Sequence, residues 1–275
     1  MEYLGKNILI SGGSRGIGLA IAELFASKGA HITIAARDED RLAQAIQQIQ
    51  VACKENSQQI SGIKLDVSRD TEVKEVIGNL IIKNGCPEIL VNSAGYAHPG
   101  LIEELSSELF RNTMDVNYFG TVNMVKAVIP GMLTRGSGSI VNISSVSGFL
   151  GIYGYTAYSG SKYAVTGFSD ALRNEMKPKG IHVSVVFPPD TDTEQLAYES
   201  KFKPDVTKTM AGNAGLLTPQ QVAKAVVDGI EQNKYVITPG FEASFFYWLH
   251  HFTGKLTFRI LDWMAVDAWR KSNQK

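Results

Sequence analysis

A tyrosine and a lysine four residues apart are the first residues in this sequence whose spacing suggests chemistry. Tyr158 and Lys162 would share one face of a helix, because residues four apart are neighbours on a helix surface. A phenol, with an ordinary pKa of about 10, is a poor acid at neutral pH, and a nearby ammonium favours its ionised form. We therefore expect Lys162 to lower the pKa of Tyr158. Alone, the pair is also compatible with an ordinary helix surface.

Two polar residues upstream would complete a set for acid–base catalysis. Ser145 follows an apolar strand-like run, 139–143, and ligands bind at the carboxyl ends of parallel strands. Its hydroxyl can hold a carbonyl oxygen while Tyr158 protonates that oxygen. Asn117 lies within a predicted helix, where asparagine is unfavourable by propensity. Its amide is either solvated or capped, or it anchors a water that links Lys162 to solvent.

A glycine-rich loop near the N-terminus predicts a phosphate-binding turn. The segment 11–18 reads Ser-Gly-Gly-Ser-Arg-Gly-Ile-Gly and stands between a predicted strand and a predicted helix. We expect Gly12 to make the tight turn, Gly16 to let the backbone approach a pyrophosphate, and Gly18 to let the helix pack closely. The helix N-terminus offers free N–H groups and the positive end of a dipole, so Ser14 and Ile17 join the predicted contacts. The alternative is a glycine-rich turn without a ligand.

Basic residues near this loop favour NADPH over NADH. The second predicted strand ends beside Arg37, where an NAD enzyme usually places a carboxylate for the ribose 2′-hydroxyl. Arg15 and Arg41 can reach the same region, and an arginine matches a 2′-phosphate bidentately. Alternatively, Arg37 and Arg41 are solvated residues at a helix start, where Asp38 and Asp40 weaken the local field.

The elements that must position these residues alternate along the chain. Strand-like runs occupy 7–10, 31–36, 60–65, 88–91, 139–143, 181–187 and 235–237. Helical patterns occupy 17–28, 40–54, 72–83, 107–134, 157–176 and 218–232. This alternation predicts a single α/β domain over residues 1–240, a doubly wound parallel sheet of Rossmann type with about seven strands and helices on both faces.

Composition excludes several classes of protein. The 275 residues are 44% hydrophobic and 20% charged, which excludes disorder, and the net charge of zero gives no global field for nucleic acid. The two cysteines and five histidines show no zinc-site spacing, so we expect no metal. There is no signal peptide and no run of eighteen apolar residues, and we expect a cytoplasmic location.

Taken together, the motifs resemble the short-chain dehydrogenases/reductases over residues 5–238. Further matching motifs are Asp66-Val67 and Asn92-Ser93-Ala94-Gly95, where the family usually has Asn at the second place of the latter. The resemblance implies that Tyr158 is the general acid, Ser145 polarises the carbonyl, Lys162 tunes Tyr158 and Asn117 orders a proton relay. It also implies cofactor contacts from Asp66, Val67, Asn92, Ala94, Gly95, Pro188 and Thr193, besides Tyr158 and Lys162.

The segment 188–193, Pro-Pro-Asp-Thr-Asp-Thr, together with 151–158, resembles the 3-ketodihydrosphingosine reductases. Those enzymes reduce the C3 ketone of a long-chain 2-amino ketone. Asp190 and Asp192 either pair with the ammonium of such a substrate or cap the following helix. Residues 188–217 would form an apolar lid that suits an acyl chain. The alternatives are a steroid, a retinoid or another lipophilic carbonyl, or a non-catalytic NADP-binding protein.

Residues 241–275 form an aromatic-rich tail that we do not expect to be an independent domain. Its longest stretch without a formal charge, 243–254, is too short to span a bilayer. In one interpretation residues 241–270 lie in a membrane interface at the cytoplasmic face, where an insoluble ketone can enter the lid. In the other, the aromatics pack onto the domain or across a subunit interface. We also expect a homo-oligomer.

Overall fold

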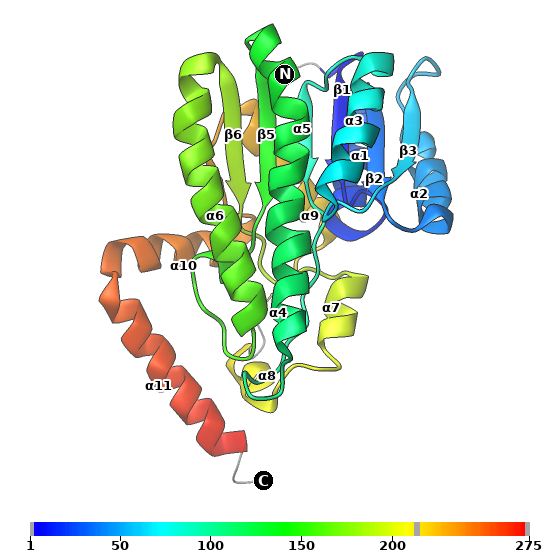
Figure 1. Ribbon diagram of the computed structural model, residues 1–275. Coiled ribbons are helices and arrows are strands. Elements are labelled where there is room, and N and C mark those ends of the chain that lie inside the picture. Colours follow the sequence, from blue (N-terminus) through cyan, green and yellow to red (C-terminus); the bar gives the residue numbers. More distant parts are fainter. Residues whose placement is uncertain (1–2, 212–214, 273–275) are drawn as a thin grey trace.

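Seven parallel strands form one sheet in the computed structural model, which describes residues 3–211 and 215–272 (Figure 1). In chain order the strands are β1 (Asn7–Ser11), β2 (His31–Ala36), β3 (Ile60–Lys64), β4 (Ile89–Asn92), β5 (Gly138–Ile143), β6 (Ile181–Val186) and β7 (Val236–Ile237). Across the sheet their order is β3-β2-β1-β4-β5-β6-β7. The direction of winding reverses between β1 and β4, which opens a crevice at their carboxyl ends. The predicted sheet is confirmed.

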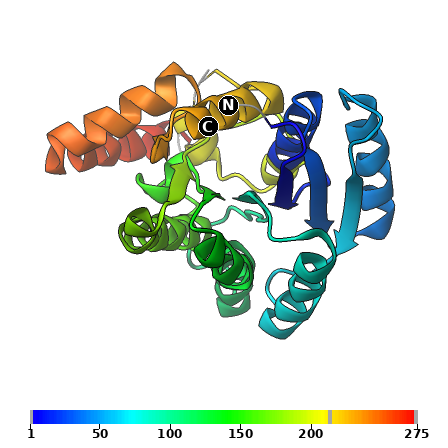
Figure 2. The ribbon, with the colours of Figure 1, turned by 90° about the horizontal axis from the view of Figure 1, so that it is seen from above.

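Helices cover both faces of the sheet (Figure 2). They are α1 (Gly16–Ser27), α2 (Glu39–Val51), α3 (Asp70–Asn84), α4 (Ser107–Met114), α5 (Gly120–Arg135), α6 (Thr156–Met176), α7 (Glu194–Glu199), α8 (Asp205–Ala211), α9 (Pro219–Glu231), α10 (Gly240–Thr253) and α11 (Lys255–Ser272). One apolar core lies under α1, α2 and α9, and a second lies under α3, α5 and α6. Ile8 and Ile10 of β1 belong to the first core and Leu9 to the second, because successive side chains of a strand point to opposite faces.

The helix expected over 107–134 is interrupted where Asn117 lies. A π-helical turn, η1 (Asp115–Phe119), separates α4 from α5. Such turns insert one extra residue into a helix and often occur at functional sites. Here the turn lies beside the loop that follows β4, since the Asn117 side chain hydrogen-bonds to the backbone of Tyr96.

Two short helices form the predicted lid, together with the loops around them. Thr193 caps α7, because its Oγ1 accepts a hydrogen bond from the Leu196 N–H at 3.3 Å. The alternative that Asp190 or Asp192 caps this helix is therefore wrong. Helix α8 follows, and residues 212–214 of the predicted lid lie outside the described residues.

The aromatic tail folds into two helices, α10 and α11, which we call the C-terminal arm (residues 240–272). Helix α10 runs out from the sheet edge, and α11 turns back along α8 (Figure 1). The ring of Tyr247 packs on Phe187 and Phe149, with centroids 5.5 and 5.2 Å away, which attaches the arm to the domain. None of the described helices combines the length and apolar character needed to cross a membrane. Residues 273–275 of the tail lie outside the described residues.

Candidate active site

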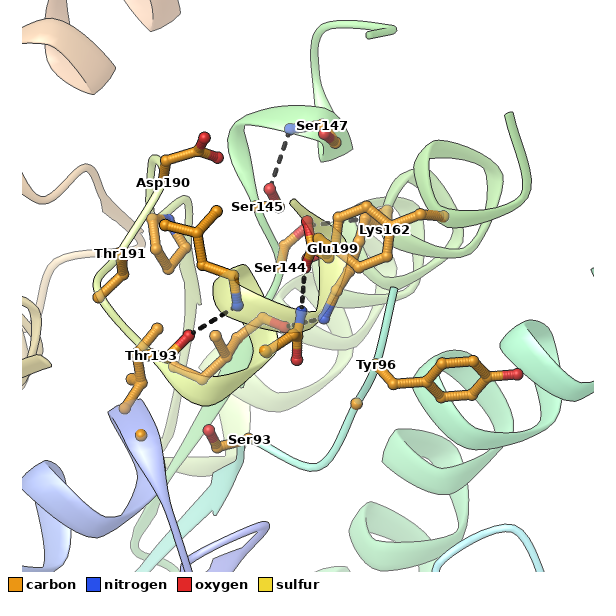
Figure 3. Close-up of a pocket in the computed structure, with 18 of the residues that line it drawn as sticks. Ser93, Tyr96, Ser144, Ser145, Ser147, Lys162, Asp190, Thr191, Thr193 and Glu199 are labelled. Carbon is orange, nitrogen blue, oxygen red and sulfur yellow. Dashed lines mark hydrogen bonds between the residues drawn. The ribbon is translucent and has the colours of Figure 1, made fainter. Parts of the chain in front are cut away.

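A cavity of about 680 Å³ opens at the carboxyl ends of the strands, where the winding reverses. Its walls come from the glycine loop, the segments after β4 and β5, the start of α6, the lid and the C-terminal arm. The volume lies within the range that small-molecule sites occupy, about 300–1,000 Å³. Figure 3 shows part of this cavity.

The glycine loop adopts a shape that side chains would block. A Cβ on Gly12 would lie 2.6 Å from the backbone nitrogen of Ala94, and one on Gly18 would lie 2.3 Å from the carbonyl oxygen of Gly12. No side chain caps the first N–H groups of α1, and Gly16 and Ile17 line the cavity there. These N–H groups and the positive end of the helix dipole fit a pyrophosphate.

Arg15, Arg37 and Arg41 line the cavity beyond the glycine loop, and a carboxylate from the lid meets two of them. Glu194, the first residue of α7, lies 2.6 Å from Arg41 and 3.4 Å from Arg15. The hydrogen bond from Arg41 holds the pKa of the Glu194 carboxyl below its usual range. Arg37 is exposed and forms no ion pair with any described residue. This cluster can accept an anion, most directly through Arg37.

Ser145, Tyr158 and Lys162 line the cavity together, as predicted. Ser145 follows β5, and its Oγ accepts a hydrogen bond from the Ser147 N–H at 3.1 Å. Tyr158 and Lys162 lie one turn apart in α6, with the Lys162 Nζ 5.6 Å from the centroid of the Tyr158 ring. The Lys162 Nζ donates to the carbonyl oxygen of Ile143 at 2.8 Å, which ties α6 to the end of β5.

Burial governs the acid–base properties of this set. It raises the pKa of Tyr158, the Glu199 carboxylate raises it further, and the Ser145 hydroxyl lowers it. Burial also lowers the pKa of Lys162 to about 8. The net shift of the Tyr158 pKa is upward because burial dominates, so the net lowering that we expected from the spacing of Tyr158 and Lys162 is wrong. Tyr158 keeps its proton at neutral pH, which is the form that a proton donor needs.

Four of the predicted site residues do not line the cavity: Gly18, Asn92, Asn117 and Asp192. Asn92 instead donates from Nδ2 to the Oδ1 of Asn142 at 2.9 Å, which joins β4 to β5. Asn117 uses both amide hydrogens, toward the Tyr96 carbonyl and the Ser161 hydroxyl. These two side chains position the walls of the cavity, and Gly18 does so by letting α1 pack closely. Every other predicted site residue lines the cavity.

The two aspartates of the lid differ from each other. Asp190 lines the cavity, and its carboxylate lies 2.8 Å from the Lys203 Nζ. Asp192 is exposed, as Asp190 is, but it does not line the cavity. Sequence reasoning missed Lys203 and two further residues in this part of the cavity, Tyr155 and Glu199. The Tyr155 hydroxyl donates to the Glu199 carboxylate at 2.7 Å.

A family model described as short chain dehydrogenase matches residues 6–203. The chain belongs to the short-chain dehydrogenase family. A 3-dehydrosphinganine reductase of Danio rerio is 41% identical over 241 residues, which are 87% of this chain and 73% of the relative.

Solved structures of the family are similar to this one over nearly their whole length. A short-chain dehydrogenase/reductase from Burkholderia phymatum in complex with NAD has a TM-score of 0.81 and 25% identity, covering 94% of this chain and 96% of that one. A short-chain dehydrogenase from Sphingobium yanoikuyae in complex with NADPH has a TM-score of 0.76 and 25% identity, covering 92% and 95%.

Family membership confirms the prediction of an oxidoreductase that uses a nicotinamide cofactor. One of the two solved structures holds NAD and the other holds NADPH. The scaffold therefore does not by itself select between them, and the side chains of this chain must do so.

Proposed function

We propose that this protein reduces the ketone of 3-dehydrosphinganine (3-ketodihydrosphingosine) to the secondary alcohol, with NADPH as the reductant. One observation supports the reaction type: Ser145, Tyr158 and Lys162 line the same cavity as the glycine loop. The substrate is supported by the name of the Danio rerio relative. It is also supported by the apolar wall that Phe246, Leu261 and Met264 of the C-terminal arm give the cavity, which suits an alkyl chain.

Ser145, Tyr158 and Lys162 each have a different role at the carbonyl group of the substrate. A bound nicotinamide would supply the hydride to the carbonyl carbon. The Ser145 hydroxyl holds the carbonyl oxygen, and Tyr158, still protonated at neutral pH, gives its proton to that oxygen as the negative charge develops. The Lys162 ammonium then lies close enough to stabilise the resulting phenolate.

NADPH is favoured by the charges at the outer end of the cavity. Arg15, Arg37 and Arg41 line it there, against two carboxylates: Glu194, which pairs with Arg15 and Arg41, and Asp38, which lies 3.5 Å from Arg41. The arginines outnumber the carboxylates, and the negative charge of a 2′-phosphate would balance the remaining positive charge.

The function is tested with purified protein, NADPH and 3-ketodihydrosphingosine in detergent micelles. We expect oxidation of NADPH and formation of dihydrosphingosine, measured by absorbance and by mass spectrometry. If steroid or retinoid ketones are reduced and 3-ketodihydrosphingosine is not, the substrate is wrong while the reaction type stands. If no ketone supports oxidation of NADPH, a non-catalytic nucleotide-binding protein becomes the better interpretation.

We further propose that the C-terminal arm lies on a membrane at its cytoplasmic face. Its inner side contributes to the cavity, whereas Phe241, Phe252 and Trp263 are 83%, 82% and 69% exposed. Exposed aromatic residues on an amphipathic helix favour the membrane interface. A lipophilic ketone could then reach the cavity along the arm. Both cysteines of the chain are free, which agrees with a reducing compartment.

Liposome flotation tests the membrane proposal. Replacing Phe241, Phe252 and Trp263 together with serine should release the protein from vesicles. The matched control replaces Val51 and Ile82, which are 88% and 85% exposed outside the arm. If the wild type stays with the soluble fraction for neutral and anionic vesicles alike, the proposal is wrong. If the triple variant instead lowers the oligomeric state in gel filtration, the arm is a subunit interface.

A further inference from the structure

A buried carboxylate lines the cavity and is not one of the three residues assigned to the carbonyl, Ser145, Tyr158 and Lys162. Glu199, the last residue of α7, lines the cavity and is only 7% exposed. Its Oε2 accepts from the Tyr155 hydroxyl at 2.7 Å, and its Oε1 accepts from the Gln195 amide at 2.9 Å. A carboxylate offers about four lone-pair positions, so roughly two are left for another donor.

The lysine in this part of the cavity forms its ion pair with another carboxylate. Lys203 lines the same part of the cavity, but its Nζ pairs with Asp190 at 2.8 Å. Among the described residues no cation lies within ion-pair distance of Glu199; burial raises the pKa of its carboxyl, and the more distant charge of Lys203 offsets only part of that rise. Asp190, Glu199 and Lys203 together carry a net charge of one negative. A buried carboxylate is costly unless a cation pairs with it. This part of the cavity therefore matches a positively charged group on the ligand.

Glu199 lies near the position where the ketone would react. Its partner Tyr155 packs against Tyr158, with ring centroids 5.9 Å apart. The Glu199 carboxylate is close enough to raise the pKa of Tyr158. Figure 3 shows Ser145, Lys162 and Glu199 in the same part of the cavity. A cationic group one carbon from the carbonyl would thus come close to this carboxylate.

We infer that Glu199 binds the ammonium of a 2-amino ketone substrate and selects for it, with Tyr155 and Gln195 as positioning residues that hold the carboxylate. This inference rests on the proposed function. It assigns the ammonium to Glu199 and not to Asp190, whose charge Lys203 compensates, or to Asp192, which lies outside the cavity.

The test compares two substrates in two variants. One substrate is 3-ketodihydrosphingosine, and the other is the same long-chain ketone without the amino group. Glu199→Gln keeps an acceptor for Tyr155 but removes the charge, and Asp192→Asn is the matched control. For the amino ketone we expect kcat/KM of Glu199→Gln to fall about 10- to 100-fold, mainly through KM, as loss of a charge-assisted hydrogen bond implies. The ketone without the amino group should lose much less, because it experiences only the effect of the removed charge on the Tyr158 pKa; the readout is therefore the ratio of the two kcat/KM values.

The outcomes separate the inference from the proposed function. If the wild type reduces the amino ketone but Glu199→Gln loses both substrates equally, Glu199 is structural and the inference is wrong. If the wild type reduces only the ketone without the amino group, the proposed substrate itself is wrong. Should Glu199→Gln fail to fold, inhibition of the wild type is compared for dihydrosphingosine and its N-acetyl derivative. The inference requires the free amine to bind at least tenfold more tightly, and equal inhibition contradicts it.

Discussion

Replacing Arg37 with alanine tests how this chain selects its cofactor. Arg37 is exposed, lines the cavity and has no ion pair among the described residues, so a 2′-phosphate would meet it without breaking another contact. Arg41 differs, because it is held by Glu194 at 2.6 Å. The two arginines should therefore contribute unequally to the binding of NADPH.

The structure sets the expected magnitudes. A charge-assisted hydrogen bond contributes about 1.5–3 kcal/mol, so Arg37→Ala should weaken NADPH binding about 10- to 150-fold. Arg41 must first release Glu194, which is 61% exposed, and such an exposed pair contributes only about 0.2–1 kcal/mol. The loss of NADPH affinity in Arg41→Ala should therefore be about 1.5- to 5-fold smaller than the loss in Arg37→Ala. By the same argument, Glu194→Gln should strengthen NADPH binding by a similar factor.

The assay is the Kd of NADPH and of NADH for each variant by calorimetry at one ionic strength, since salt screens exposed charges. Arg111, which is exposed on α4 and outside the cavity, provides the control substitution Arg111→Ala. NADH binding should be nearly unchanged throughout. Equal losses for NADPH and NADH in Arg37→Ala would refute the reasoning, as would weaker NADPH binding in Glu194→Gln.

Two further predictions concern the reacting groups. Tyr158→Phe should lower kcat by about 10²- to 10⁴-fold while the Kd of NADPH is retained, and a kcat near that of the wild type would contradict the proton transfer. Lys162→Met should abolish activity and remove a pH dependence of stability, because burial lowers the pKa of Lys162 from 10.5 to about 8 in the folded chain. Since the unfolded chain binds more protons between these values, urea titrations should show wild-type stability rising from pH 8 to 10.5 and no such rise in Lys162→Met, and equal slopes in the two proteins would refute this.

The fold could be predicted because local patterns and tertiary packing agree along most of the chain. Apolar runs buried on both faces became strands, as in β4, and the amphipathic segments became the helices that cover them. The π-helical turn at Asn117 could not be foreseen. In this turn the Asn117 side chain accepts from the Tyr96 N–H and donates to the Tyr96 carbonyl and the Ser161 hydroxyl, and both partners are far away in the sequence. Helix propensity indicates that an asparagine is unfavourable at this position, but it gives no information about the hydrogen-bond partners that compensate for it.

The same limit applies to the acid–base groups. Spacing places Tyr158 and Lys162 on one face of α6, and the structure has them there, 5.6 Å apart from ring centroid to Nζ. Spacing does not describe burial, however, and burial decides both pKa shifts. An argument from charge alone therefore gave the wrong direction for Tyr158, because desolvation of a phenolate exceeds the attraction of an ammonium whose own charge is disfavoured by the same surroundings.

The carboxylates show most clearly what separates a motif from a site. Asp190 and Asp192 lie beside a cofactor-binding segment in the sequence, which made them the natural candidates for an ammonium. In the folded chain Lys203 pairs with the first, and the second is exposed. Glu199 belongs to no motif, and its partner Tyr155 lies 44 residues away. A carboxylate acquires a strong preference for a cation only when it is buried and left without one, and both conditions depend on contacts between distant parts of the chain. We therefore expect substrate specificity at this site to depend on which carboxylate is buried and lacks an ion-pair partner. On this basis Glu199 discriminates between ketones with and without the amino group, and Asp192 does not.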